Sequence, residues 1–251
     1  MKKCSRILLL LLLFGAAANL AAAYKETMKY VSNEKENKKL NDLVIIQEEK
    51  LEKNTQCKKI NFMVLQKINP DICAWISIPG TKIDYPVLIG KNDEMYLNHD
   101  YRGEYSELGS LFSFSDAKRD FSDAHICIFA HNMRKPQMFG ELKRYREVNY
   151  AKEHTELYLY TPGKTERYRL ISSFQCGKRD AVFAHKMEKN SAEFGKLCND
   201  IFLRNELECM NGWIEQDTIE KIVTLSTCSE YDRTQQRFTV HFKKIEGNDE
   251  N

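Results

Sequence analysis

Eight short runs with strand character, separated by turn signals and joined by few helical stretches, constrain the fold of this chain most. Turn signals such as Asn69-Pro70-Asp71 and Pro79-Gly80 punctuate its middle. Many short strands with few helices favour a closed or nearly closed barrel, because closure removes exposed strand edges. The runs are Ala74–Ile78, Ile83–Ile89, Ser110–Phe114, His125–His131, Glu156–Tyr160, Arg167–Phe174, Ile219–Thr227 and Arg237–Lys244.

The last two runs flank a polar segment that begins at a cysteine. Residues 219–223 are mostly β-branched or apolar, and residues 237–242 alternate strictly between apolar and polar side chains. Because neighbouring strands lie about 4.8 Å apart, we expect the Cys228 thiol and the Arg237 guanidinium to lie close together. A nearby cation favours the thiolate, so Cys228 is a candidate nucleophile.

The first residues resemble an export signal. Lys2, Lys3 and Arg6 precede the apolar run Ile7 to Ala23, which would span roughly 26 Å as a helix. A cleaved signal peptide and an uncleaved signal-anchor both fit this pattern. In either case we expect the chain after Tyr24 to be exported.

Helices are expected in three places beyond the leader. Residues 24–65 contain no Gly or Pro and carry apolar residues at near-helical spacing, which predicts one or two amphipathic helices with a solvated Lys/Glu-rich face. Asp93–Asn98 reads as a short helix. Ser191–Asn211 reads as a long one, with Asn190 as its cap and Glu193 three residues later.

Composition excludes several classes of function. The formal charge of +2 over 251 residues and the lack of a basic stripe give no indication of nucleic-acid binding. None of the eight cysteines forms a Cys-x-x-Cys pair, so a structural zinc site is not expected. We expect Cys73 and Cys127, in apolar strand-like runs, to be small buried side chains.

Three stretches together resemble the class B sortases, membrane-anchored cysteine transpeptidases of Gram-positive bacteria. They are Thr224-Leu225-Ser226-Thr227-Cys228 followed by Arg237, the run Ile126 to Met133 with the later Met138 to Leu142, and the run Ile68 to Val87. The resemblance covers about residues 60–245. It implies a mainly β fold, an eight-stranded sortase-type barrel with N-terminal helices and a long helix before the seventh strand. It also favours a signal-anchor at 1–23, a helical stalk and helical addition at 24–66, and a catalytic barrel at 67–251.

The resemblance implies a role for each of three side chains. Cys228 would attack the peptide carbonyl, His131 would protonate the leaving amine, and Arg237 would hold the oxyanion. Arg233 is the rival to Arg237, but a strand residue is held in one direction whereas a loop arginine loses entropy when it is positioned. Leu97 and Ser226 are candidate substrate contacts. The other histidines are expected at the surface or in loops: His99, His125, His154, His185 and His241.

The implied reaction is cleavage of a C-terminal sorting signal of the Asn-Pro-x-Thr-Asn kind and transfer of the protein to an amine. The partners would be surface proteins that bear this signal, and a cell-wall peptide or pilin that offers the amine. No metal or other cofactor is expected, since the chain has no Gly-rich phosphate loop and no His-Glu-x-x-His. Two rivals remain: a secreted cysteine protease, although papain-like enzymes place the cysteine before the histidine, and a non-catalytic wall-binding barrel.

Overall fold

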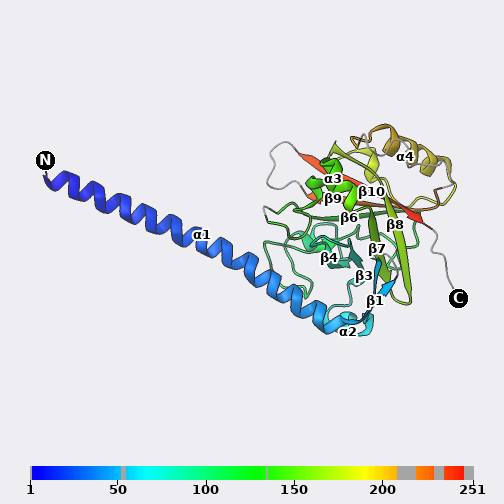
Figure 1. The fold of residues 1–251 in the computed structure, drawn as a ribbon, viewed down its shortest axis with the longest axis horizontal. Helices are drawn as coiled ribbons and strands as arrows, with labels where there is room; N and C mark the ends of the chain where they lie inside the picture. The colour runs from blue at the N-terminus through cyan, green and yellow to red at the C-terminus, as the bar shows by residue number, and fades with distance from the viewer. Residues whose placement is uncertain (1, 52–54, 134, 208–218, 229–234, 246–251) are drawn as a thin grey trace. The chain divides into compact units, whose positions relative to one another are not determined.

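The computed structural model describes residues 2–51, 55–133, 135–207, 219–228 and 235–245, and the chain forms two compact units, residues 1–43 and 44–251. The first unit consists of the helix α1 (Lys2–Val44), whose last residue already belongs to the second unit. The helix is rich in Leu, Ala, Glu and Lys, which are strong helix formers (Figure 1). None of the helices in the described part of the chain is both long enough and apolar enough to cross a bilayer. The expected domain limits at residues 23 and 66 stay predictions.

The prediction of helix in residues 24–65 is wrong for residues 45–51 and 55–60. There β1 (Ile45–Leu51) and β2 (Thr55–Ile60) form an antiparallel hairpin, from the pair Ile45–Ile60 to the pair Leu51–Thr55. Contacts with the barrel explain the difference, because the Lys58 ammonium lies 2.6 Å from an Asp84 carboxylate oxygen and the Lys58 amide donates to the Tyr160 hydroxyl. Local helical spacing gives way to such tertiary contacts. The short helix α2 (Phe62–Ile68) follows the hairpin.

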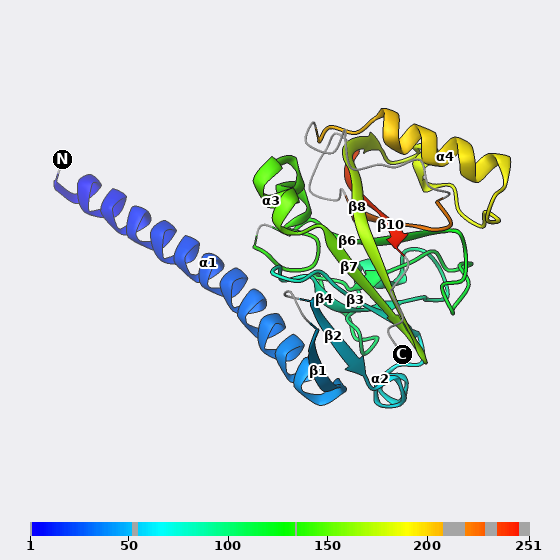
Figure 2. The same cartoon turned by 45° about the vertical axis from the view of Figure 1, so that its right-hand side comes forward.

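Eight strands close into a barrel in the order β10-β8-β7-β3-β4-β5-β6-β9, which confirms the predicted fold class (Figure 2). Most neighbours are antiparallel, but β4 pairs with β5 and β6 pairs with β9 in parallel. The strands are β3 (Ile72–Ser77), β4 (Asp84–Leu88), β5 (Leu111–Phe112), β6 (His125–His131), β7 (Glu156–Thr161), β8 (Lys164–Gly177), β9 (Ile222–Cys228) and β10 (Gln236–Ile245).

Short helical turns occupy the connections between strands. The helix expected at Asp93–Asn98 is a single 3-10 turn, η1 (Met95–Leu97). Two more elements lie between β6 and β7, namely η2 (Leu142–Arg146) and α3 (Val148–Glu153), and η3 (Ala181–Phe183) follows β8. The core of the barrel includes Trp75, which is completely buried, and Cys73 and Cys127 are buried as predicted.

The long helix before the seventh barrel strand is α4 (Ala192–Leu203), although its start differs from the prediction. Ser191, not Asn190, caps it, and the Ser191 hydroxyl accepts a hydrogen bond from the Phe194 amide. Asn190 has a φ of 61°, so this residue belongs to the turn before the helix. The helix also ends earlier than expected, and residues 208–211 of the predicted range lie outside the described part of the chain.

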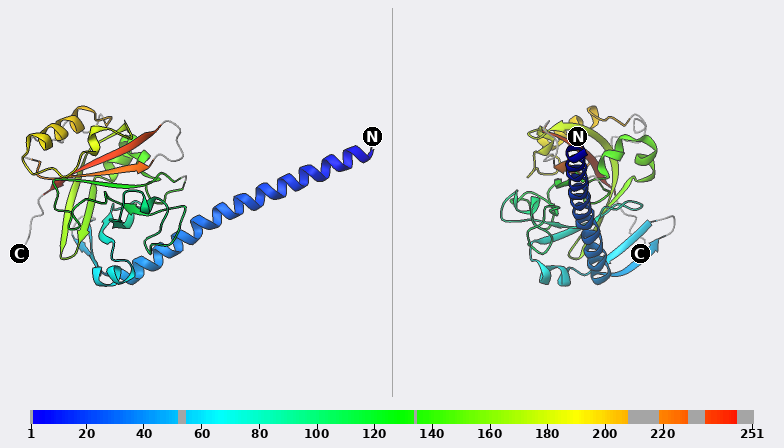
Figure 3. Two further views of the ribbon diagram at one scale, coloured as in Figure 1. Left: turned by 180° about the vertical axis from the view of Figure 1, so that it is seen from behind. Right: turned by 90° about the vertical axis from the view of Figure 1, so that its left-hand side faces the viewer.

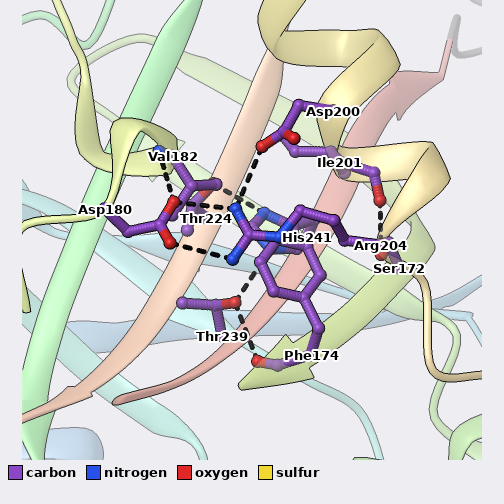
Figure 4. A network of polar contacts seen from close by, with 10 residues as sticks. All are labelled: Ser172, Phe174, Asp180, Val182, Asp200, Ile201, Arg204, Thr224, Thr239 and His241. Atoms are coloured by element: carbon purple, nitrogen blue, oxygen red, sulfur yellow. Dashed lines mark hydrogen bonds and ion pairs between the residues drawn. The ribbon is translucent and has the colours of Figure 1, made fainter. Parts of the chain in front are cut away.

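Helix α4 and η3 cover one outer face of the barrel. The expectation that His125 and His241 lie at the surface is therefore wrong. Both imidazoles are buried, and each hydrogen-bonds the Thr224 hydroxyl, at 2.7 Å and 2.9 Å. Arg204, at the end of α4, binds both carboxylate oxygens of Asp180 and also bonds Asp200 (Figure 4). Burial lowers the pKa of His125 to about 4 and holds the pKa of His241 well below its usual value.

Candidate active site

His131 and Cys228 lie at the same end of two paired strands. Strands β6 and β9 are parallel and stay in register from His125 opposite Ile222 to His131 opposite Cys228. Register partners on adjacent strands direct their side chains to the same face, and their backbones are about 4.8 Å apart. The structure describes the backbone of Cys228 and not its side chain. The register nevertheless places a thiol-bearing residue directly beside the histidine.

Arg237 enters the same edge from the other side of β9. Strands β9 and β10 are antiparallel and lie side by side (Figure 3). Their register sets Ser226 opposite Thr239. That register, continued by two residues, sets Arg237 across from Cys228. The structure therefore brings all three predicted residues to one end of β6, β9 and β10. Arg233 lies outside the described residues.

Two aromatic rings hold the Arg237 guanidinium. Its central carbon lies 5.3 Å from the ring centre of Phe129 and 5.5 Å from that of Phe183. Cation–π contacts of this kind orient the planar group without consuming its N–H donors. Indeed, the Arg237 Nε is buried and has no hydrogen-bond partner within the described ranges. The guanidinium is thus oriented by the two rings and keeps N–H donors for an oxygen of a ligand.

The His131 ring is almost fully buried, at 3% exposure, and its Nε2 lies 2.7 Å from the Leu97 carbonyl oxygen. A carbonyl oxygen only accepts hydrogen bonds, so this Nε2 carries the proton and donates it. In a neutral imidazole the other nitrogen, Nδ1, is then the basic atom. The ring is thus set up to receive or release a proton at Nδ1.

The two residues expected to contact substrate differ in their surroundings. Leu97 lies in η1 with a half-buried side chain, and its backbone carbonyl accepts the hydrogen bond from His131 Nε2. Ser226 is completely buried, and its hydroxyl donates to the Thr227 carbonyl at 3.4 Å, so in this structure it offers no surface to a peptide. Substrate contacts at both residues stay predictions.

Sequence reasoning missed the residues that support the three side chains. Phe129 lies two residues before His131 on the same strand face, a signal that could have been read from the alternation. Phe183 and the Leu97 carbonyl come from connections far away in the chain, and no local pattern indicates them. No set of three or more His, Cys, Asp or Glu side chains in the described ranges is arranged to hold a metal ion.

A barrel with a cysteine, a histidine and an arginine at one edge defines a class of enzymes that act on peptide bonds through a thiol. The chain belongs to the sortase family, because the sortase domain model matches residues 76–245. Its relatives are class B, and the protein is a sortase-type cysteine transpeptidase.

Two sortase B proteins and one complex represent these relatives. Sortase B of Listeria monocytogenes is 27% identical over 182 residues, 72% of each chain. The crystal structure of Clostridium perfringens sortase B is 30% identical, with a TM-score of 0.64, and the match covers 74% of this chain and 100% of that one. The crystal structure of a sortase B complexed with triglycine is 26% identical, with a TM-score of 0.67, and the match covers 74% and 85% of the two chains.

Proposed function

We propose that this sortase cleaves a C-terminal sorting signal of the Asn-Pro-x-Thr-Asn kind and transfers the new carboxyl end to an amine of the cell wall or of a pilin. Cys228 is the nucleophile, His131 the acid and base, and Arg237 the group that holds the oxyanion. The observation that carries the proposal is the register of β6 and β9, which pairs His131 with Cys228 at the end of both strands.

In the first half of the reaction, the Cys228 thiol gives its proton to Nδ1 of His131, and the sulfur forms a bond to the threonine carbonyl carbon. The carbonyl electrons move onto oxygen, where the Arg237 fork and backbone N–H groups stabilise the charge. The bond from carbon to nitrogen then breaks, and the leaving amine takes a proton from Nδ1 of His131. The result is a thioester on Cys228, with His131 neutral again.

In the second half, an amine attacks the thioester carbon and gives a proton to Nδ1 of His131. The bond from carbon to sulfur breaks, and the leaving sulfur of Cys228 takes the proton from Nδ1 of His131, which restores both residues. The complex of a sortase B with triglycine supports an amine as the second substrate. The burial of His131 also supports transfer, because a site that limits water disfavours hydrolysis of the thioester.

The experiment compares turnover of a sorting-signal peptide by the full-length chain with and without added triglycine. Product that carries triglycine, formed faster as triglycine increases, supports transfer. Hydrolysis at the same rate with or without triglycine, and cleavage of unrelated peptides, would instead favour a secreted cysteine protease. A chain that binds wall fragments and never cleaves a panel of sorting peptides would favour a wall-binding barrel.

The N-terminal segment is proposed to hold the enzyme at the cell membrane, with the barrel outside the cell. The basic residues Lys2, Lys3 and Arg6 followed by the apolar run 7–23 support this orientation, since basic residues stay on the cytoplasmic side. Recovery of the chain with membranes, and its digestion by protease added to intact cells, are the expected results. Recovery in the cytosolic fraction would contradict the assignment.

A further inference from the structure

The Leu97 carbonyl that accepts the His131 proton is packed against a glycine. Gly109 has a φ of 58°, in the left-handed region, and a side chain at this position would place its Cβ 2.6 Å from the Leu97 oxygen. The same Cβ would lie 2.6 Å from the Tyr96 oxygen. Both distances are far below contact distance, and the obstructing atoms are backbone. Any other residue at position 109 must therefore push apart the backbone of residue 109 and these two carbonyls, one of which binds His131.

Tyr96, the residue before Leu97 in η1, is held by its own hydrogen bonds. The Tyr96 ring is 1% exposed, and its hydroxyl donates to an Asp71 carboxylate oxygen and accepts from the Asn69 amide, both at 2.9 Å. The Tyr96 carbonyl accepts from the Ser110 amide at 2.9 Å. These bonds tie η1 to the start of the barrel and to the segment that contains Gly109. The turn that carries the Leu97 carbonyl is thus held by the close approach of Gly109 and by the hydrogen bonds of Tyr96.

We propose that Gly109 and the Tyr96–Asp71 pair are positioning residues for His131. They place the Leu97 carbonyl so that it receives Nε2–H and leaves Nδ1 as the atom that exchanges protons with Cys228. This inference rests on the proposed function in giving His131 the acid–base role. By this inference Gly109, which has no side chain, helps to set the tautomer and the orientation of the His131 imidazole.

Substitution of Gly109 by alanine tests the positioning role. Displacement of a catalytic group by about 1 Å can lower a rate about 100-fold, so we expect kcat to fall by about 10- to 100-fold with a smaller change in KM. Gly163→Ala is the matched control, because Gly163 also has a positive φ, of 78°, but no atom within 4 Å of the added Cβ. Both variants carry the backbone strain of a left-handed alanine, and only Gly109→Ala moves the Leu97 oxygen.

A second readout follows the His131 ring directly and does not depend on catalysis. In nitrogen NMR of the histidine-labelled full-length chain, wild type and Gly163→Ala should show His131 protonated at Nε2 when neutral. Gly109→Ala should show a mixture of the two tautomers. If the His131 resonances of Gly109→Ala match those of wild type, or if its kcat equals that of Gly163→Ala, the positioning role is overturned. If the wild-type chain transfers no peptide but shows the expected tautomer pattern, the proposed function is overturned. The inference that Gly109 positions the imidazole then still stands.

Tyr96→Phe decides the question if Gly109→Ala does not fold. It removes the hydroxyl that binds Asp71 and keeps the buried ring. We expect about a 3- to 10-fold lower kcat, consistent with loss of one hydrogen bond of about 1 kcal/mol that acts through the Leu97 carbonyl. Tyr158→Phe is its control, because it removes a comparable hydroxyl bond, to Glu156 at 3.0 Å, away from His131. Equal kcat values for the two variants would overturn the proposal.

Discussion

His131 and Cys228 are register partners at the ends of two parallel strands. Parallel neighbours are joined by long connections, so the two residues are almost 100 positions apart in the chain and still adjacent in space. In the proposed mechanism, this pairing lets two residues on neighbouring strands exchange a proton. The arginine reaches the same edge from β10, which follows β9 directly.

His131→Gln should lower amine-dependent turnover by about 100- to 10,000-fold, the usual contribution of a positioned acid and base. Glutamine keeps a donor for the Leu97 carbonyl but cannot exchange a proton near neutral pH. The measurement is the rate of triglycine product formation from a sorting peptide. His154→Gln, a partly exposed histidine of the barrel unit, is the control and should retain wild-type turnover. Equal rates for the two variants would remove His131 from the mechanism.

Arg237→Lys should reduce kcat by about 100- to 1,000-fold, as for loss of one oxyanion donor. An ammonium cannot reproduce the contacts of the planar guanidinium with the Phe129 and Phe183 rings or offer two parallel N–H groups. Arg169→Lys, at an exposed position of β8, is the control and should behave as wild type. If Arg233→Lys is the damaging change and Arg237→Lys is not, the oxyanion role belongs to Arg233.

The thiols of the barrel described in the structure should react slowly at neutral pH. Burial raises the pKa of Cys73 and Cys198 to about 11 and that of Cys176 to about 12, and raises the pKa of Cys127 further. Thiol labelling at pH 7 followed by peptide mapping should find Cys228 modified well before these four. Faster labelling of Cys198 than of Cys228 would contradict an activated nucleophile at position 228.

Stability should decrease as the pH falls from about 6.5 to about 4. In the unfolded chain, His125 and His241 take up protons near pH 6.5, whereas their folded pKa values are lowered, to about 4 for His125. The unfolded state therefore binds more protons in this window, and the stability present above pH 6.5 is progressively lost. At about 1.4 kcal/mol per pKa unit, His125 accounts for about 3 kcal/mol.

Urea denaturation at several pH values measures this effect. His241→Gln should make the dependence shallower, although it also costs stability at every pH because of its bonds to Thr224 and Thr239. His154→Gln should leave the slope as in wild type. A stability that is flat between pH 6.5 and 4.5 would show that the buried imidazoles take up protons in the folded state.

Much of the barrel could be predicted from the chain, because strand alternation and turn residues are local signals. Alternation places His241 and Phe242 on opposite faces of β10 but does not say that α4 covers the outer face, so the burial of His125 and His241 was missed. The hairpin at residues 45–60 was missed for a related reason, since Lys58 is held by Asp84 in a distant strand. Phe183 and Gly109 act through contacts between connections, which leave no periodic signal.

Mass spectrometry of the full-length chain after incubation with an Asn-Pro-x-Thr-Asn peptide, without added amine, tests the central claim most directly. The proposed mechanism predicts an adduct with the mass of the peptide up to its threonine, mapped to Cys228 and released as triglycine product when triglycine is added. Cys198→Ala should form the same adduct, and Cys228→Ala should form none. An adduct on another residue, or unchanged product formation by Cys228→Ala, would contradict the assignment of Cys228 as nucleophile.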